Sequence, residues 1–240
     1  MTSTRKTALW AGVLYLLSFV SIPTLFLYTS VRGANYIVGP GPDTRVYIGV
    51  TLELIVGLAG IGTAVALYPV VKRQNEGVAL GFVGTRTLEA ATIFGSVTAL
   101  MAVVALRQAG AGAAELATGH ALISVHDWTF LFGQALMPAV NALLIGSLLY
   151  QSRLVPRALP LLGFIGAALL VVSTMSTVFG ANEYGSAASG LLSLPIAIWE
   201  FSLGVYLIVK GFRAAGLQKL GFIPAPADEL QQAKERKQAA

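Results

Sequence analysis

Six stretches of this chain are apolar enough and long enough to cross a lipid bilayer as helices. A transmembrane helix needs about 20 mostly apolar residues. The stretches that reach this length are residues 8–29, 46–71, 78–106, 124–150, 158–179 and 191–212. We therefore predict an all-α fold: an integral membrane bundle of six transmembrane helices over residues 1–213, followed by a polar, flexible cytoplasmic tail over residues 214–240.

The connections between these stretches predict helical hairpins. Residues 72–77 and 151–157 are short polar turns. Residues 30–45 contain the run Gly-Pro-Gly-Pro, which is too rigid for a helix. Residues 107–123 include the run AGAGAAELATG, for which we expect a flexible loop or a short surface helix.

The composition supports a membrane protein and excludes several kinds of chemistry. Charged residues make up 11% of the chain, against about 25% in soluble domains. The mean hydropathy of +0.73 would not keep a chain of this kind in water, so we expect it to contact the lipid bilayer. Cysteine is absent, which removes disulfides, cysteine-ligated metals and thiol catalysis. The chain also lacks the glycine-rich motifs of phosphate-binding loops, and we predict no cofactor.

Lys and Arg are distributed unevenly between the two sides of the predicted bundle. If the N-terminus is cytoplasmic, 12 of the 16 basic residues lie in inner segments and three in outer loops, with Arg86 inside a span. Cytoplasmic loops of membrane proteins carry the excess of Lys and Arg. We therefore predict a multi-pass protein of the cell membrane with both termini in the cytoplasm. Because the cations flank spans and form no continuous patch, we expect no nucleic-acid partner.

Three segments resemble a known family. They are LYPVVKRQNEGVALG at residues 67–81, SRLVPR at residues 152–157 and LPIAIWEFSLGVYLIVKGF at residues 194–212. Together they resemble a bacterial family of six-span membrane proteins that is described only as a domain of unknown function. The resemblance covers about residues 5–213 and implies six helices, one domain and the bacterial cytoplasmic membrane. It implies no activity and no ligand.

Four ionisable residues lie well inside the predicted spans: Glu53, Arg86, Glu89 and Glu200. At a rise of 1.5 Å per residue, Arg86, Glu89 and Glu200 all lie about 12–16 Å from the inner ends of their helices. We expect these three to share one layer, with Arg86 paired to Glu89 or to Glu200. Glu53 lies about 10 Å from the outer side, at a different level.

The surroundings of these acids suggest that they face the interior of the bundle. Gly57 and Gly60 follow Glu53 at helical spacing, and Ala197 and Gly204 flank Glu200. Small residues allow helices to approach closely, so these faces should point away from lipid. Three acids share one base, and we expect at least one of the three carboxyls to carry a proton at neutral pH.

The fourth predicted span carries a polar stripe. Asp127, Gln134 and Asn141 recur every seven residues, which keeps them near one face of a straight helix. Pro138 removes the hydrogen bond to the Gln134 carbonyl, so we expect a kink there. The stripe is either a set of interhelical hydrogen bonds or part of a solute site of the kind that broken helices form in transporters.

A metal site receives little support from the two histidines. His120 and His126 are six residues apart and share no helix face, so we favour ordinary hydrogen bonding and predict no metal. No arrangement of Ser, His and Asp indicates a nucleophile, and we assign no catalytic residue.

Three interpretations of the buried polar residues remain open at this stage. The first is a site that binds or transports a small solute or a proton. The second is a dry polar network in a structural or regulatory membrane module. The third, and least supported, is an intramembrane enzyme that uses paired carboxylates. A homo-oligomer could complete a transport pathway, and Gly77 and Gly81 form a GxxxG helix-contact motif.

Overall fold

The computed structural model describes residues 2–183 and 185–224, and within them the regular structure is helical throughout. The helices are α1 (Ser3–Leu17), α2 (Thr24–Leu27), α3 (Thr44–Val71), α4 (Glu76–Gln108), α5 (Leu116–Phe130), α6 (Met137–Ser152), α7 (Ala158–Val178), α8 (Ala187–Val209) and α9 (Ala214–Lys219). Short 3₁₀ turns cover Ser18–Ser21, Tyr36–Val38 and Ala113–Glu115, and a π-helical turn covers Leu131–Leu136. Within the described residues, six helical runs are long and apolar enough to span a membrane, which confirms the predicted number of spans.

Several helices begin where the sequence supplies a capping side chain. The Thr2 side chain accepts a hydrogen bond from the Arg5 amide at the start of α1. Asn75 caps α4 in the same way, and Ser186 caps α8. Such side chains satisfy backbone donors that the first turn of a helix leaves free.

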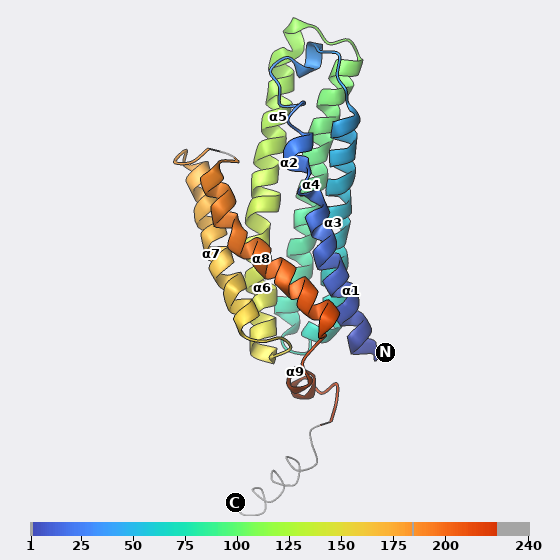
Figure 1. Cartoon of the computed structure of the whole chain (residues 1–240), viewed down its shortest axis with the longest axis vertical. Coiled ribbons are helices and arrows are strands. Elements are labelled where there is room, and N and C mark those ends of the chain that lie inside the picture. The colour runs from blue at the N-terminus through green and yellow to red at the C-terminus, as the bar shows by residue number, and fades with distance from the viewer. Residues whose placement is uncertain (1, 184, 225–240) are drawn as a thin grey trace, which may run out of the picture.

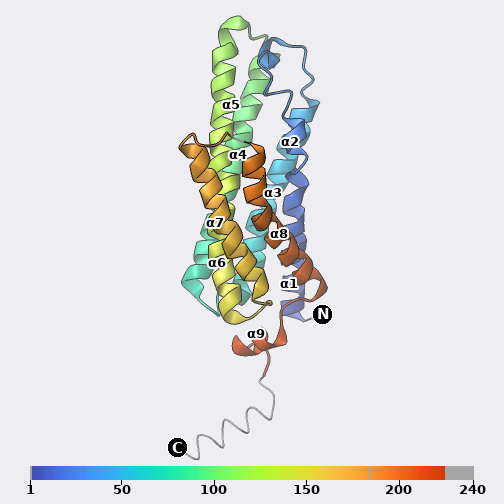
Figure 2. The ribbon, with the colours of Figure 1, turned by 60° about the vertical axis from the view of Figure 1, so that its left-hand side comes forward.

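The long helices stand roughly side by side, and α8 crosses them obliquely (Figure 1). The closest packing is between α3 and α4, between α7 and α8, and between α1 and α8. We call the end with residues 2–6, 72–75, 153–157 and 210–224 the basic end. The end with residues 28–43, 109–115 and 179–186 is the loop end, where α4 and α5 extend beyond α7 and α8 (Figure 2).

Two apolar clusters fill the bundle, and most of the buried charge lies between them. On α4, the cluster towards the basic end includes Phe82, and the cluster towards the loop end begins at Val97. Arg86 and Glu89 lie between these two positions. On α3, Glu53 lies between Val50 of one cluster and Ala64 of the other. The polar layer is therefore a gap in an otherwise apolar core.

The first predicted span is not one regular helix. α1 ends at Leu17, and a 3₁₀ turn separates it from α2. The Ser18 hydroxyl donates to the Tyr15 carbonyl over 2.6 Å, and Pro23 removes a further backbone donor. The predicted helix over residues 8–29 is therefore broken in its second half.

Most of the stretch over residues 107–123, for which we expected a flexible loop or a short surface helix, is helical. α5 begins at Leu116, so the connection after α4 is short. The Glu115 side chain accepts a hydrogen bond from the Gly112 amide over 2.7 Å at the start of this segment. Gly119 lies against Ile37, and His120 Nε2 donates to the Ala34 carbonyl over 3.1 Å. The Ala- and Gly-rich composition of residues 109–119 did not reveal that a helix there packs on the loop after α2.

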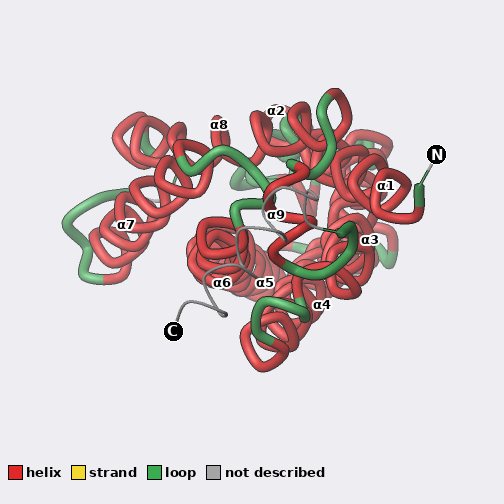
Figure 3. Tube along the Cα trace, turned by 90° about the horizontal axis from the view of Figure 1, so that it is seen from below, coloured by secondary structure: helices red, strands yellow, loops and turns green. Residues whose placement is uncertain are grey.

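The segment after residue 213 begins as part of the bundle. α9 lies beneath the basic end (Figure 3). Gly216 packs on the backbone of Leu154, Leu220 is buried, and the Arg73 guanidinium lies 3.8 Å from the centre of the Phe222 ring. Of the tail predicted over residues 214–240, residues 225–240 lie outside the described residues.

The GxxxG motif at the start of α4 has a partner within the chain. A side chain at Gly81 would meet Leu144 of α6 at 3.8 Å. Gly81 therefore faces α6 within the chain, whereas Gly77 is exposed, and the homo-oligomer stays a prediction.

Candidate functional site

One guanidinium binds two carboxylates in the middle of the bundle. Arg86 Nη1 lies 2.9 Å from Glu89 Oε2, and Arg86 Nη2 lies 3.0 Å from Glu200 Oε1. Arg86 and Glu89 are one turn apart on α4, whereas Glu200 comes from α8. The arginine therefore pairs with both acids, and the sequence could not choose between them because both lie at its depth. We call Arg86, Glu89 and Glu200 the central site.

Helix α6 contributes a hydrogen-bonding residue to the central site, in addition to the charged residues from α4 and α8. Asn141 Nδ2 donates to Glu89 Oε2 over 2.7 Å, and the Thr85 hydroxyl donates to Asn141 Oδ1 over 2.6 Å. Thr85 was not predicted, because a threonine that can bond to its own helix carries no distinct signal in a sequence. These two hydrogen bonds fix the orientation of the Asn141 amide, with its NH₂ group towards the Glu89 carboxylate.

A cavity of about 260 Å³ adjoins the central site. Every one of the six spans contributes to its wall, and its charged members are Arg86, Glu89 and Glu200. The side chain of Glu200 is 14% exposed, against 5% for Arg86. Arg86 Nε and Gln134 Nε2 are buried without a hydrogen-bond partner among the described residues. The cavity thus meets the negative charge of the two acids and the positive charge of Arg86.

The polar stripe on the fourth span is interrupted. Gln134 lies in the π-helical turn and lines the cavity, and Asn141 reaches Glu89. Asp127 is not brought to the central site: its carboxylate lies 2.6 Å from Arg32 at the loop end. One π turn holds an extra residue, which rotates the following helix by about 100° relative to a straight α-helix. The prediction of one continuous face over these three residues is therefore wrong.

The irregularity that we expected from Pro138 takes the form of this π turn. Pro138 is near the first position of α6, and the π turn ends at Leu136. Proline has no N–H, so the Gln134 carbonyl has no α-helical donor four residues later. The widened turn brings Gln134 to the cavity wall.

Aromatic rings hold the buried arginine on its other side. The Arg86 guanidinium carbon lies 5.5 Å from the centre of the Tyr15 ring and 5.7 Å from that of Phe82. Tyr15 meets the fully buried Trp199 edge to face at 6.5 Å. Trp199 fits only because Gly163 of α7 has no side chain. These rings fix the arginine by packing and by cation–π attraction.

The remaining predicted residues lie nearer the loop end. Glu53 is fully buried one turn from Val56, which lines the cavity. His126 Nδ1 is hydrogen-bonded to Asp127 Oδ1 at 2.9 Å, whereas His120 bonds to the Ala34 carbonyl. The two histidines thus have separate partners, in agreement with ordinary hydrogen bonding.

A further ion pair, which the sequence did not single out, joins the loop after α2 to the end of α4 at the loop end. Arg107 Nε donates to Asp43 Oδ1 over 2.8 Å, and Gln108 donates to the other oxygen over 3.0 Å. Tyr36 also donates to Asp43. Burial alone would raise the pKa of this carboxyl, but the hydrogen bonds from Arg107, Tyr36 and Gln108 lower the pKa of Asp43 to about 2. Asp43 therefore clamps the loop after α2 to the end of α4.

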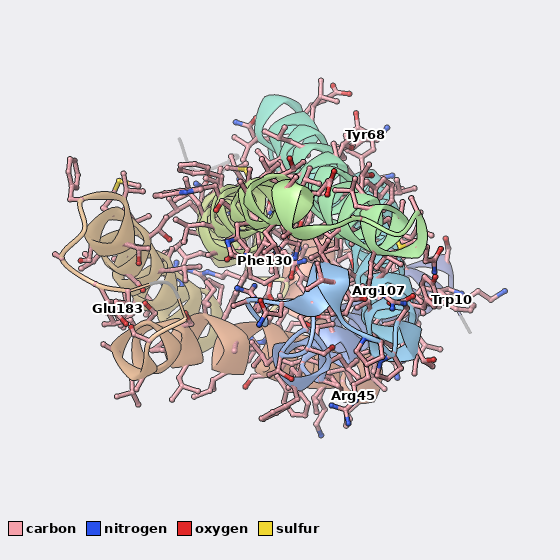
Figure 4. The ribbon with its side chains drawn as sticks, turned by 90° about the horizontal axis from the view of Figure 1, so that it is seen from above. Trp10, Arg45, Tyr68, Arg107, Phe130 and Glu183 are labelled. Atoms are coloured by element: carbon pink, nitrogen blue, oxygen red, sulfur yellow. The ribbon has the colours of Figure 1, made fainter. Side chains whose placement is uncertain are left out.

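Viewed from the loop end, Phe130 lies towards the interior of the bundle, whereas Trp10, Arg45 and Glu183 lie at its periphery (Figure 4). Phe130 lines the cavity from α5. The ring therefore forms part of the cavity wall on the side of the loop end.

A family model described as "Domain of unknown function (DUF4386)" matches residues 10–211. The match contains Glu53, Arg86, Glu89 and Glu200, and most of each helical run that can cross a membrane. No curated protein and no solved structure matches the chain. Since the family model covers most of its length, this six-span chain belongs to the DUF4386 family.

Proposed function

We propose that the protein binds a small polar solute or a proton at the central site, as a step in moving it within or across the membrane. The observation that carries this proposal is the cavity of about 260 Å³ beside the ion-paired Arg86, Glu89 and Glu200. A buried network that only fixed helices would need no adjoining space. The volume is near the lower limit of ordinary ligand pockets, which favours a small solute.

The charges of the central site indicate what it would accept. Two acids face one base, so the site carries one excess negative charge when all three groups are ionised. A buried charge is costly unless it is compensated. A proton or the positive group of a small solute would supply the compensation.

Glu200 is the acid best placed to take part. It has one ion-pair partner, Arg86, whereas Glu89 also accepts from Asn141. Glu200 is also the more exposed of the two acids. Binding at Glu200 would leave the pair between Arg86 and Glu89 intact.

The test uses two small ions of opposite charge, methylammonium and acetate, and the full chain in mild detergent. Methylammonium should raise the melting temperature of the wild type, and acetate should not. A ligand at 100 times its Kd stabilises the folded state by about 2.7 kcal/mol. The same chain in liposomes with an enclosed pH dye reports proton movement.

Glu200→Gln should abolish the methylammonium shift and slow proton movement. Glu76→Gln, the same change at an exposed position, should leave both signals intact. If the wild type shows neither signal, or if Glu200→Gln retains both, the central site is a structural network and the proposal fails.

A further inference from the structure

A second group of buried polar side chains lies between the central site and the loop end. Glu53 is fully buried, and neither of its carboxylate oxygens has a hydrogen-bond partner among the described residues. The Tyr28 hydroxyl and His126 Nε2 are also buried without a partner there. We call Glu53, Tyr28 and His126 the loop-end cluster. Unsatisfied buried groups are rare in folded proteins, and three in one place require an explanation.

The Tyr28 ring bridges the two other members of the cluster. It lies over Gly49, one helical turn before Glu53, where any side chain would overlap it. Its ring meets that of His126 edge to face, with 5.6 Å between the ring centres. The hydroxyl is close enough to Glu53 to interact with its carboxyl electrostatically, but makes no hydrogen bond of ordinary length with it.

The cluster continues to the surface through charged groups. His126 Nδ1 is hydrogen-bonded to Asp127 at 2.9 Å, and the Asp127 carboxylate is ion-paired with Arg32 at 2.6 Å. Both charged residues are partly exposed. Polar groups therefore run from partly exposed Asp127 through His126 and Tyr28 to buried Glu53.

Tyr28 and Arg32 are the charged or titratable groups that act on the Glu53 carboxyl, and both follow α2. Among the described residues, α1, α4 and the 3₁₀ turn Ser18–Ser21, which also pack on α3, bring no further group of this kind to it. An ionised carboxylate in this position would be buried without a hydrogen bond, at a cost that proteins avoid by neutralising the group. A bound proton removes the charge and supplies an O–H donor.

Apolar side chains separate this cluster from the central site. Val56 lies one turn below Glu53 on α3, and Phe130 lies one turn below His126 on α5. Both line the central cavity, and the rings of Phe130 and His126 are 6.0 Å apart. Polar groups therefore connect Glu53 to the loop end, whereas apolar side chains separate it from the cavity.

From this geometry we infer that Glu53 is a second, separate proton-binding site, which exchanges its proton with the loop end through Tyr28 and His126. The transfer moves a proton between oxygen and nitrogen atoms and breaks only the bond to the proton that is passed on. The structure has no hydrogen bond between Glu53 and the Tyr28 hydroxyl or between that hydroxyl and His126 Nε2, so one water molecule in each gap would complete the path. The inference does not depend on what the central site binds.

Infrared spectroscopy of the full chain in lipid tests the inference directly. A protonated carboxylic acid gives a carbonyl stretching band that is distinct from that of a carboxylate or an amide, and that shifts in D₂O. The wild type should show this band at neutral pH, and Glu53→Gln should reduce its intensity. Glu89→Gln and Glu200→Gln should retain it, which separates this site from the central one.

The route is tested by the rate at which the band shifts after transfer to D₂O. Tyr28→Phe removes the hydroxyl and should slow the shift about tenfold, equivalent to about 1.4 kcal/mol in the barrier. Tyr15→Phe is the matched control, because Tyr15 is equally buried with an unpartnered hydroxyl but lies at the central site.

Each outcome decides a part of the inference. A wild type without the band, or a band of unchanged intensity in Glu53→Gln at an unchanged melting temperature, would overturn the proton site. Equal exchange rates in Tyr28→Phe and Tyr15→Phe would overturn the route. If Glu53→Gln unfolds, the Tyr28→Phe exchange rate still tests the route on the native carboxyl.

Discussion

Arg86 Nη2 lies 3.0 Å from Glu200 Oε1, and this ion pair joins α4 to a helix that packs mainly on α7 and α1. Both residues line the central cavity. The charge on Glu200 therefore influences how firmly α8 is held to the centre of the bundle. A solute or proton that neutralised Glu200 would weaken this link, which connects binding to the position of a helix.

The two acids of the central site should contribute unequally to stability. Glu89 is held by Arg86 and Asn141, whereas Glu200 is held by Arg86 and is more exposed. Removing one partner of a buried ion pair costs about 3–5 kcal/mol. Because Arg86 keeps one acid in either variant, we expect a loss of about 3 kcal/mol for Glu89→Gln and about 1 kcal/mol for Glu200→Gln.

Unfolding by heat or denaturant in mild detergent measures both losses. Glu76→Gln is the exposed control and should change stability by less than about 0.5 kcal/mol. A larger loss for Glu200→Gln than for Glu89→Gln would contradict the assignment of the structural role to Glu89.

The spans were predictable because the bilayer imposes one simple requirement, a long apolar helix. The proximity of Arg86 and Glu89 was predictable too, because residues three apart on a helix are neighbours. The depth count also placed Glu200 in the same layer. These inferences needed only the regular rise and rotation of an α-helix.

The rest of the site depends on departures from that regularity. The π turn at Leu131–Leu136 separates Asp127 from Asn141, and no count along a straight helix reproduces it. The contacts of Tyr28 with Glu53 and His126 depend on how the loop after α2 folds back over Gly49. Loop geometry of this kind follows from tertiary packing, which a hydropathy pattern does not encode.

Close packing of α7 on α8 should make Gly166 intolerant of any side chain. A Cβ at this position would lie 2.6 Å from the backbone nitrogen of Ile196, and backbone atoms cannot move aside. We expect Gly166→Ala to cost about 1–3 kcal/mol, the usual range for overpacking. Gly84→Ala is the control, since no atom lies within 4 Å of its Cβ and alanine favours helix. Equal melting temperatures for the two variants would contradict this packing.

The orientation in the membrane can be tested on the native sequence, which has no cysteine. The excess of Lys and Arg predicts that Gln151 faces the cytoplasm and Glu183 the outside. Both residues are exposed in the structure. Gln151 lies at the end of α6, at the basic end of the bundle, and Glu183 follows α7 at the loop end. A membrane-impermeant thiol reagent should label Glu183→Cys in intact cells, and Gln151→Cys only after lysis. Labelling of Gln151→Cys in intact cells would reverse the predicted orientation.

The clamp between Asp43 and Arg107 should make the loop end sensitive to acid. The pKa of Asp43 falls from 3.8 to about 2 on folding, so the folded state favours the ionised carboxylate. The resulting stability is fully present above the unfolded pKa and is lost as the pH falls through the folded pKa.

We expect Asp43→Asn to be less stable than the wild type by about 1 kcal/mol at pH 6, a modest value because solvent screens pairs near the surface. The difference should shrink between about pH 4 and pH 2, as the wild-type carboxyl takes up its proton. Unfolding curves of both proteins across this range measure it, with Asp127→Asn as a control at a different ion pair of the loop end. A difference that stays constant down to pH 2 would show that Asp43 stabilises the loop by its shape and not by its charge.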